Sequence, residues 1–451
     1  MTLTAFEPHA TSLLETFQTP GAIVALSNPT YQRSFGYRNV EEKHLINEET
    51  IFGIGSITKV MTCMAIMKLQ EEGKLSVRDV VHKHVPEFSI SNQESMKRIT
   101  IHHLMTHTSG LPPLDTLFYA NKSSISMEEF KSIDDQLDVD APSIDTENQF
   151  FAHLHTSSFQ LLGKPGERFS YSNDGYAILG TIIERVSGQS YDAYMKEAIF
   201  IPADMKRSFF SREKLADDAN VTQLYTMEPD GEGVKIEASP TWWDAPTMWA
   251  AGYVKSTAKD MLRFANQLMS QSATILSKNS LEALTATHVE IEPGLHYGYG
   301  LMIHTDFFGK RMIQHGGGIK GVSAQLSILP DENIAGICLT NIAGAPANPL
   351  LQAALKEMIG EKPETPSAHY EDVTLSSTEK LEMTGTYQAN EGQSLEIVEK
   401  EGELSIILEG NNLPARTVGT TMLAVHLYGE DRLLIFNKPY LQFGYRQLQK
   451  V

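Results

Sequence analysis

Residues 51–75, IFGIGSITKVMTCMAIMKLQEEGKL, constrain the fold most, because they predict a strongly apolar helix that has to lie in a protein core. The helix is expected from Ser56 to Glu72, ended by Gly73. Ser56 and Lys59 stand three residues apart at its start, so their side chains share one face and can touch. Burial lowers the pKa of a lysine, and an unprotonated lysine can activate a serine hydroxyl as a nucleophile.

The pattern Ser-x-x-Lys occurs four times in the chain, so spacing alone does not identify a reactive pair. The four pairs are Ser56/Lys59, Ser211/Lys214, Ser256/Lys259 and Ser377/Lys380. Ser211 lies in a charged run and Ser377 in a polar linker. Ser256 is predicted to cap a helix, with Thr257 and Asp260 forming a capping box. Only Ser56 follows a glycine-punctuated apolar segment and opens a long apolar helix, so Ser56 and Lys59 are the predicted pair.

Composition excludes several classes of protein. A hydrophobic fraction of 41% over 451 residues predicts a globular chain with more than one domain. A net charge of −19 disfavours binding to nucleic acid or to an anionic membrane. The two cysteines, Cys63 and Cys338, lie in apolar runs and are expected to be core residues rather than a disulfide. No signal peptide or membrane span is evident, which predicts a cytoplasmic protein.

The order of the predicted elements indicates an α+β fold. Strand patterns occur at 21–27 and 31–36 and again at 251–256, 297–304, 310–315, 323–330 and 334–341, with helices at 8–17 and 349–359. We expect residues 1–360 to form an antiparallel sheet flanked by helices, with a mostly helical subdomain at 111–245. A charged, proline-bearing linker follows at 361–376.

Residues 377–451 are predicted to form a small all-β domain, a sandwich or barrel. Six short alternating runs, at 385–389, 394–400, 403–410, 422–429, 432–438 and 440–448, are separated by turn residues.

Four segments together resemble the serine β-lactamase-like hydrolases, a superfamily that includes class C β-lactamases, D-aminopeptidases and penicillin-binding-protein-related peptidases and esterases. The segments are GSITK (55–59), HLMTHTSGLP (103–112), PGERFSYSNDGYAILGTIIERVSG (165–188) and HGGGIKG (315–321). The resemblance covers roughly residues 8–360. The C-terminal strands resemble the lipocalin-like barrels appended to some peptidases of this superfamily.

Tyr171-Ser172-Asn173 matches the second motif of this superfamily, tyrosine-x-asparagine. A nearby lysine ammonium is expected to lower the pKa of Tyr171, which would let it exchange a proton with Ser56. Asn173 is expected to orient the pair. Tyr119-Ala120-Asn121 has the same pattern and remains a rival, but Tyr171 precedes a clear amphipathic helix that Ser172 or Asn173 could cap.

His315-Gly316-Gly317 matches the third motif, where many relatives have lysine-threonine-glycine. The Gly318 amide is expected to form an oxyanion hole with the Ser56 amide, and Gly317 to let the backbone approach the substrate. A histidine in place of the lysine weakens the usual hold on a substrate carboxylate. This departure argues against a dedicated β-lactamase or carboxypeptidase. The alternative interpretation is a glycine-rich hairpin beside a structural histidine.

Other patterns are less informative. Neither a dinucleotide-binding site nor an α/β-hydrolase oxyanion motif fits the context of 315–321, because a strand follows and no Gly-x-Ser-x-Gly is present nearby. Histidine pairs lack a third ligand at zinc spacing, so no metal is predicted. Trp242 and Trp243 are interpreted as core residues by default, with a hydrophobic substrate wall as the alternative.

The resemblance implies a hydrolase that acts through an acyl-enzyme on Ser56, without a metal or organic cofactor. The expected substrates are peptides or amides, in the manner of D-aminopeptidases. The alternatives are an esterase of short acyl esters and a sensor that is acylated without turnover. The C-terminal domain is expected to shape the cleft or to assemble a homo-oligomer.

Overall fold

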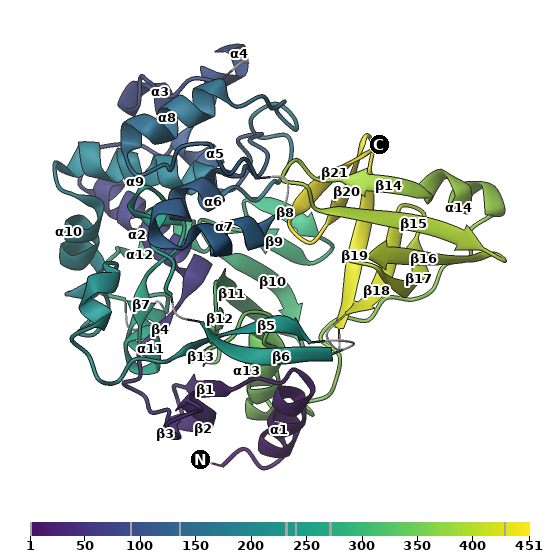
Figure 1. Cartoon of the computed structure of the whole chain (residues 1–451), viewed down its shortest axis with the longest axis horizontal. Coiled ribbons are helices and arrows are strands. Elements are labelled where there is room, and N and C mark those ends of the chain that lie inside the picture. Colours follow the sequence, from purple (N-terminus) through teal and green to yellow (C-terminus); the bar gives the residue numbers. More distant parts are fainter. Residues whose placement is uncertain are drawn as a thin grey trace.

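The computed structural model describes residues 2–90, 93–134, 137–230, 233–239, 241–269, 273–427 and 430–451. Within them, an antiparallel sheet of nine strands forms the centre of the larger domain (Figure 1). Its strands, in spatial order, are β3 (His44–Leu45), β2 (Tyr31–Asn39), β1 (Gly21–Leu26), β13 (Ile334–Thr340), β12 (Val322–Leu329), β11 (Lys310–Ile319), β10 (Met302–Phe307), β9 (Leu295–Tyr297) and β8 (Val289–Glu292). Strands from the beginning and the end of the larger domain therefore meet in one sheet, as the sequence predicts.

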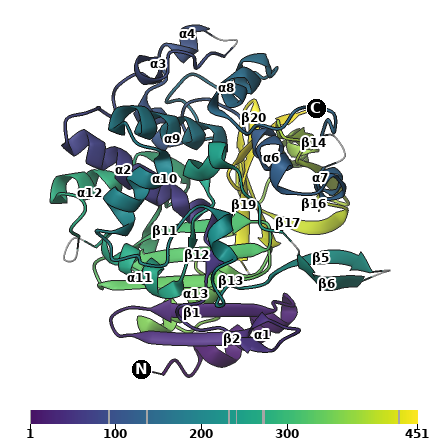
Figure 2. The same ribbon diagram turned by 60° about the vertical axis from the view of Figure 1, so that its left-hand side comes forward.

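Strand β1 is buried along its whole length because helices cover both faces of the sheet. Ile23 and Ala25 belong to one core, which includes helix α2 (Thr58–Glu71), α11 (Ala258–Asn266) and α12 (Lys278–Leu284). Val24 and Leu26 belong to a second core with α1 (Phe6–Thr16) and α13 (Ala347–Met358). This alternation follows from the two-residue period of a strand. Figure 2 shows α1 and α13 close to β1.

Helices gather in a separate layer above the sheet, visible in the upper left of Figure 1. They are α3 (Val81–His84), α4 (Gln93–Met96), α5 (Ile101–Met105), α6 (Thr116–Asn121), α7 (Met127–Ile133), α8 (Glu147–Thr156), α9 (Asn173–Ser187) and α10 (Tyr191–Met195). Short turns of helix are η1 (Gly55–Ile57), η2 (Lys122–Ser124), η3 (Lys196–Phe200), η4 (Arg212–Leu215) and η5 (Pro246–Ala251). Helix α2 packs against α9 and η5, so the predicted apolar helix lies in the core between the layers.

Two details of this region differ from the sequence prediction. Residues 224–230 and 233–239, expected to be helical or irregular, form the antiparallel strands β5 (Leu224–Asp230) and β6 (Gly233–Ser239), which project from the body in Figure 2. The predicted strand at 251–256 is reduced to β7 (Lys255–Ser256), which pairs with β4 (Phe52–Gly53) outside the main sheet. The strand is short for two reasons. The 3-10 turn η5 extends to Ala251, and Tyr253 has a φ of 83°, which residues in extended strands do not adopt.

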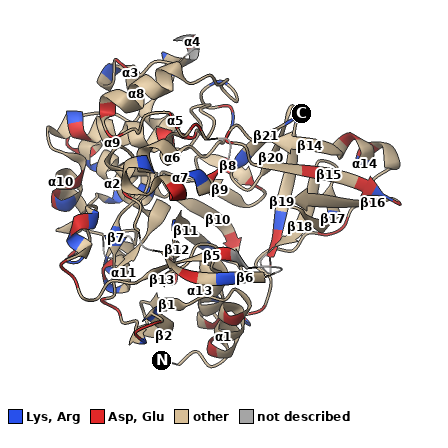
Figure 3. Ribbon diagram, in the orientation of Figure 1, with Lys and Arg blue, Asp and Glu red and all other residues tan. Residues whose placement is uncertain are grey.

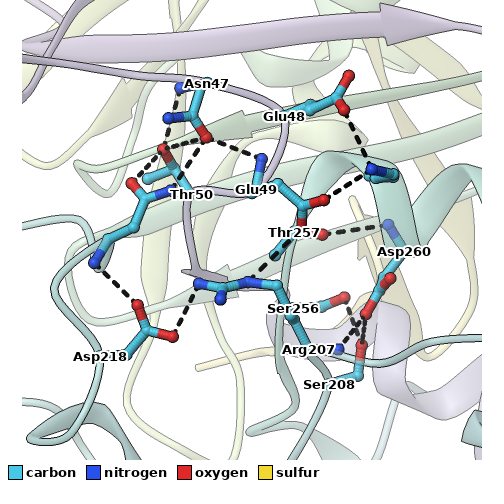
Figure 4. Close-up of polar contacts among 12 residues, drawn as sticks. Asn47, Glu48, Glu49, Thr50, Arg207, Ser208, Asp218, Ser256, Thr257 and Asp260 are labelled. Atoms are coloured by element: carbon cyan, nitrogen blue, oxygen red, sulfur yellow. Dashed lines mark hydrogen bonds and ion pairs between the residues drawn. The ribbon is translucent and has the colours of Figure 1, made fainter.

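A polar network fixes the segment that leads into β4 (Figure 4). Arg207 pairs with Asp218 at 2.8 Å, and Lys259 pairs with Glu49 at 2.7 Å. The Ser256 hydroxyl lies 2.8 Å from that of Ser208. Ser256 and Lys259 thus have structural partners, and their Ser-x-x-Lys spacing marks a helix start. Thr257, and not Ser256, caps α11, since the Thr257 hydroxyl accepts from the Asp260 amide.

The C-terminal strands close into an eight-stranded antiparallel barrel, which confirms the barrel alternative for the all-β domain. Helix α14 (Ser377–Met383) precedes β14 (Gly385–Gln388), β15 (Ser394–Lys400), β16 (Glu403–Leu408), β17 (Asn411–Gly419), β18 (Met422–Leu427), β19 (Glu430–Asn437), β20 (Tyr440–Phe443) and β21 (Arg446–Lys450). Strand β17 was not predicted because its alternation is weak and polar. The predicted run at 440–448 is two strands, joined by a two-residue turn at Gly444 and Tyr445.

The barrel packs against the edge of the main sheet at β8 and β9, where Tyr445 joins the apolar cluster of Phe169, Ile291 and Tyr297 (Figure 1). Buried glutamines reinforce this contact: Gln447 donates to the Phe169 carbonyl at 3.0 Å, and Gln442 donates to the Ile291 carbonyl at 2.7 Å. Residues of both charge signs occur over both domains (Figure 3).

Candidate active site

Ser56 and Lys59 form a direct contact at the start of α2. The Lys59 ammonium nitrogen, Nζ, lies 3.1 Å from the Ser56 hydroxyl oxygen. The turn η1 carries Ser56, and α2 begins two residues later, so the backbone places both side chains on one face. The predicted pair is therefore brought together.

Lys59 is fully buried, and its other two partners are neutral oxygens. Nζ donates to the Asn173 side-chain oxygen at 2.8 Å and to the Ala251 carbonyl at 2.5 Å. Among the described residues, no carboxylate pairs with Lys59. Burial, and secondly the positive charge of Arg446, hold the pKa of Lys59 well below its usual value. This shift favours the unprotonated amine, the form of Lys59 that can accept a proton.

Tyr171 and Asn173 flank the start of α9, as predicted. The Ser172 hydroxyl accepts from the Gly175 amide and caps the helix, which leaves Tyr171 before the helix and Asn173 as its first residue. The Tyr171 ring centre lies 4.8 Å from Lys59 Nζ. The rival Tyr119 instead accepts from the Asp138 amide and belongs to the packing of α6.

The pKa of Tyr171 shifts in the direction opposite to the one predicted. Burial raises the pKa of Tyr171 above its ordinary value, although an interaction with Ser56 and the charge of Arg446 oppose this shift. Desolvation of a phenolate therefore outweighs the nearby positive charges. Tyr171 is a protonated phenol at neutral pH, which suits it to donate a proton rather than to start as the base.

His315, on β11, lines the same cavity as Ser56 but does not carry a positive charge. Burial, and secondly Lys59, lower the pKa of His315 to about 3. Its Nδ1 lies 2.6 Å from the Gly316 carbonyl, so Nδ1 carries the proton, and Nε2 accepts from the Tyr297 hydroxyl at 3.2 Å. The neutral ring is held in one orientation by these two contacts.

The glycines after His315 let β11 touch the segment that carries Ser56. A Cβ at Gly317 would lie 2.0 Å from the Ile54 carbonyl oxygen. A Cβ at Gly55, whose φ is 49°, would lie 2.7 Å from the Gly318 amide nitrogen. No residue with a side chain fits at 317 without moving the strand, so the glycine sets the distance between Gly318 and Ser56.

Two cavities meet at Ser56. The larger, about 790 Å³, lies between the sheet and the barrel and includes Tyr171 and His315. The smaller, about 370 Å³, lies towards the helical layer and includes Asn173 and Trp243. Trp243 also donates to Glu129 at 3.0 Å. Trp242 lines neither of them and instead packs near Gly53, so only Trp243 can form part of a substrate wall here.

Several residues near the site were not predicted. Tyr445 and Arg446 come from the barrel and line the larger cavity; the Tyr171 amide donates to the Tyr445 carbonyl at 3.3 Å. Gly444 is the sequence feature that could have indicated them, because a glycine inside an alternating run is typical of a tight turn. In the structure its φ is 57°. The His107 ring also lies against Tyr171, with ring centres 4.2 Å apart and ring planes tilted by 33°.

The described residues contain no group of three or more histidine, cysteine, aspartate or glutamate side chains arranged to hold a metal ion. Helices long and apolar enough to cross a membrane are likewise absent from the described part of the chain.

Comparison with known proteins identifies the family. The sequence profile described as Beta-lactamase matches residues 9–357. The chain belongs to the beta-lactamase family. Among curated relatives, penicillin-binding protein 4* of Bacillus subtilis is 28% identical over 345 residues, covering 74% of this chain and 71% of that protein.

Solved structures extend the similarity of this beta-lactamase-family chain into the barrel. The octameric penicillin-binding protein homologue from Pyrococcus abyssi is 27% identical, with a TM-score of 0.73 over 100% of both chains. A D-stereospecific amidohydrolase from Streptomyces sp. shares the fold, with 22% identity and a TM-score of 0.63 over 78% of this chain and 98% of that one. Membership of this family indicates a hydrolase.

Proposed function

We propose that this protein is a serine hydrolase that cleaves peptide or amide bonds through an acyl-enzyme on Ser56. The observation that carries the proposal is the contact of 3.1 Å between Nζ of the buried Lys59 and the partly exposed Ser56 hydroxyl. A lysine with a lowered pKa and only neutral partners can act as the base for that hydroxyl.

The acylation step follows from the positions of three groups. Neutral Lys59 takes the hydroxyl proton while Ser56 Oγ forms a bond to the substrate carbonyl carbon. The amides of Ser56 and Gly318 stabilise the oxyanion. Tyr171 gives its phenolic proton to the leaving nitrogen as the carbon–nitrogen bond breaks, and it regains a proton from the Lys59 ammonium.

Deacylation uses the same base. A water molecule gives a proton to neutral Lys59 while its oxygen attacks the acyl carbon. The carbon–Oγ bond then breaks, and Ser56 recovers a proton from Lys59. The substrate acid leaves, and the site returns to its first state.

The protonated state of Tyr171 favours amides over esters as the substrate class. An amine leaves as a neutral molecule only after it receives a proton, whereas an activated ester releases a weakly basic anion. A phenol that burial keeps protonated is therefore most useful with an amide. The D-stereospecific amidohydrolase among the structural relatives is consistent with this choice.

The test is a panel of D- and L-aminoacyl amides, short esters and a cephalosporin, run on wild type and on Ser56→Ala. We expect loss of all hydrolysis in Ser56→Ala, with Ser211→Ala as a control in an exposed Ser-x-x-Lys pair. Activity that survives in Ser56→Ala contradicts the mechanism. Burst kinetics with a chromogenic ester separate an enzyme from a sensor, because a sensor releases one equivalent of product and then stops.

A further inference from the structure

The turn between β20 and β21 brings a cation from the barrel into the larger cavity. Phe443 pairs with Arg446 across a turn of two residues, with Gly444 at the first position, a tight geometry that defines where Arg446 begins its strand. The Arg446 guanidinium carbon lies 5.8 Å from the centre of the Tyr171 ring. Lys59 and Arg446 therefore both lie against Tyr171, one from each domain.

Among the described residues that line this cavity, the other groups do not place a positive charge against Tyr171. His315 is neutral, and both of its ring nitrogens have partners. Of the described arginine and lysine residues that line the cavity, Arg432 pairs with Glu430 at 3.3 Å. Arg446 pairs with Glu391, and it is the arginine of this cavity that lies against the Tyr171 ring.

The Arg446 guanidinium keeps donors available for a ligand. Its Nε donates to Glu391, while its two terminal nitrogens have no hydrogen-bond partner among the described residues. About a quarter of the side chain, 27%, is exposed to solvent. Arginine is permanently charged, and its planar fork of N–H groups matches the two oxygens of a carboxylate.

Three of the acidic side chains that line the same cavity are paired with other arginines or are partly neutral. Asp431 pairs with Arg416, and Glu430 pairs with Arg432. Burial raises the pKa of Glu292 to about 7, so this carboxyl is partly protonated at neutral pH. Glu391 is the one acidic partner of Arg446 among the described residues, and it occupies only Nε.

We propose that Arg446 binds a carboxylate of the substrate, so that the barrel supplies the cation that His315 does not. The substrate class is then an amide or ester with a free carboxylate near the bond that is cleaved. This inference rests on the proposed function of Ser56. It assigns to the barrel a direct part in substrate recognition.

The test compares three chromogenic esters. The first, 4-nitrophenyl butyrate, is neutral. The second, 3-carboxy-4-nitrophenyl butyrate, has a carboxylate on the leaving group. The third, the mono-4-nitrophenyl ester of glutaric acid, has a carboxylate on the acyl chain. The measured quantity is the ratio of kcat/KM for each charged ester to kcat/KM for the neutral ester. Indirect effects through Tyr171 act on all three esters, so the ratio reports the carboxylate contact.

For at least one charged ester we expect the ratio to fall by about 10- to 100-fold in Arg446→Gln, the factor that a hydrogen bond to a charged group contributes. Arg446→Lys, which keeps the charge but loses the fork, should keep part of the ratio. Arg432→Gln is the matched control, since it removes another arginine that lines the same cavity and, like Arg446, pairs with a carboxylate. Its ratio should equal that of wild type.

The outcomes separate this inference from the proposed function. Hydrolysis that depends on Ser56 but shows the same ratios in wild type, Arg446→Gln and Arg446→Lys overturns the role of Arg446 alone. Hydrolysis that is unchanged in Ser56→Ala overturns the proposed function. Should Arg446→Gln fail to fold, the ratios of Arg446→Lys and wild type still decide the question.

Discussion

The side-chain oxygen of Asn173 lies 2.8 Å from Lys59 Nζ, which makes a neutral amide the nearest side-chain neighbour of the candidate base. Asn173→Asp would place a carboxylate there and raise the pKa of Lys59 by about 1 to 3 units. Because the base must be unprotonated, the rise of kcat/KM with pH should move to higher pH. The check is a pH–rate profile of this variant and of Asn173→Ala, which removes the contact without adding charge. An unmoved acidic limb in Asn173→Asp argues against Lys59 as the base.

Tyr171→Phe should slow amide hydrolysis by about 10²- to 10⁴-fold, because the leaving nitrogen loses its proton donor. Hydrolysis of a 4-nitrophenyl ester should fall much less, since its leaving group departs as an anion. Measured kcat values for an amide and an ester with the same acyl group check this. Tyr119→Phe, in the rival motif, is the control. Equal losses on both substrates in Tyr171→Phe contradict proton donation by Tyr171.

Gly317→Ala should disturb the site through the backbone. Its Cβ would lie 2.0 Å from the Ile54 carbonyl oxygen, so β11 must move away from the segment that carries Ser56. We expect a loss of about 1–3 kcal/mol in the free energy of unfolding, as for other overpacked positions, together with a lower kcat. A Cβ at Gly318 would meet nothing within 4 Å, so Gly318→Ala should keep the thermal midpoint of wild type. Similar midpoints for the two variants contradict this account.

Acid should destabilise the protein through its buried neutral histidines. Burial lowers the pKa of His304 to about 4, from an ordinary value of 6.5 in the unfolded chain. Between these values the unfolded chain binds more protons, so the free energy of unfolding falls as pH drops from about 6.5 towards 4. His304→Gln should weaken that dependence, whereas substitution of the exposed His369 should not. Urea unfolding at several pH values between 4 and 7 measures it, and identical pH dependence in His304→Gln and wild type is the contrary result.

The local sequence was sufficient to predict those residue pairs of the site that lie together at the start of one helix. Ser56 and Lys59 share a helix start, and Tyr171 and Asn173 flank another, so spacing and capping residues indicated their relation. Most strands of the sheet were also predicted, because burial on both faces leaves long apolar runs such as β13.

What could not be predicted depends on contacts between distant segments. The Ala251 carbonyl reaches Lys59 only because η5 packs against α2. Tyr445 and Arg446 reach Tyr171 only because the barrel docks on β8 and β9. The direction of the pKa shift of Tyr171 was missed for the same reason, since complete burial is a property of the assembled fold and exceeds the effect of the neighbouring charges.

The closed barrel has a consequence for specificity. Strand β21, which begins at Arg446, pairs with β20 on one side and with β14 on the other. Its register cannot shift by one residue without breaking pairs on both sides, so Arg446 cannot drift gradually away from Tyr171. The preference for a charged over a neutral substrate should therefore be lost in a single step when the barrel unfolds. Hydrolysis at Ser56 can persist to a higher temperature without that preference.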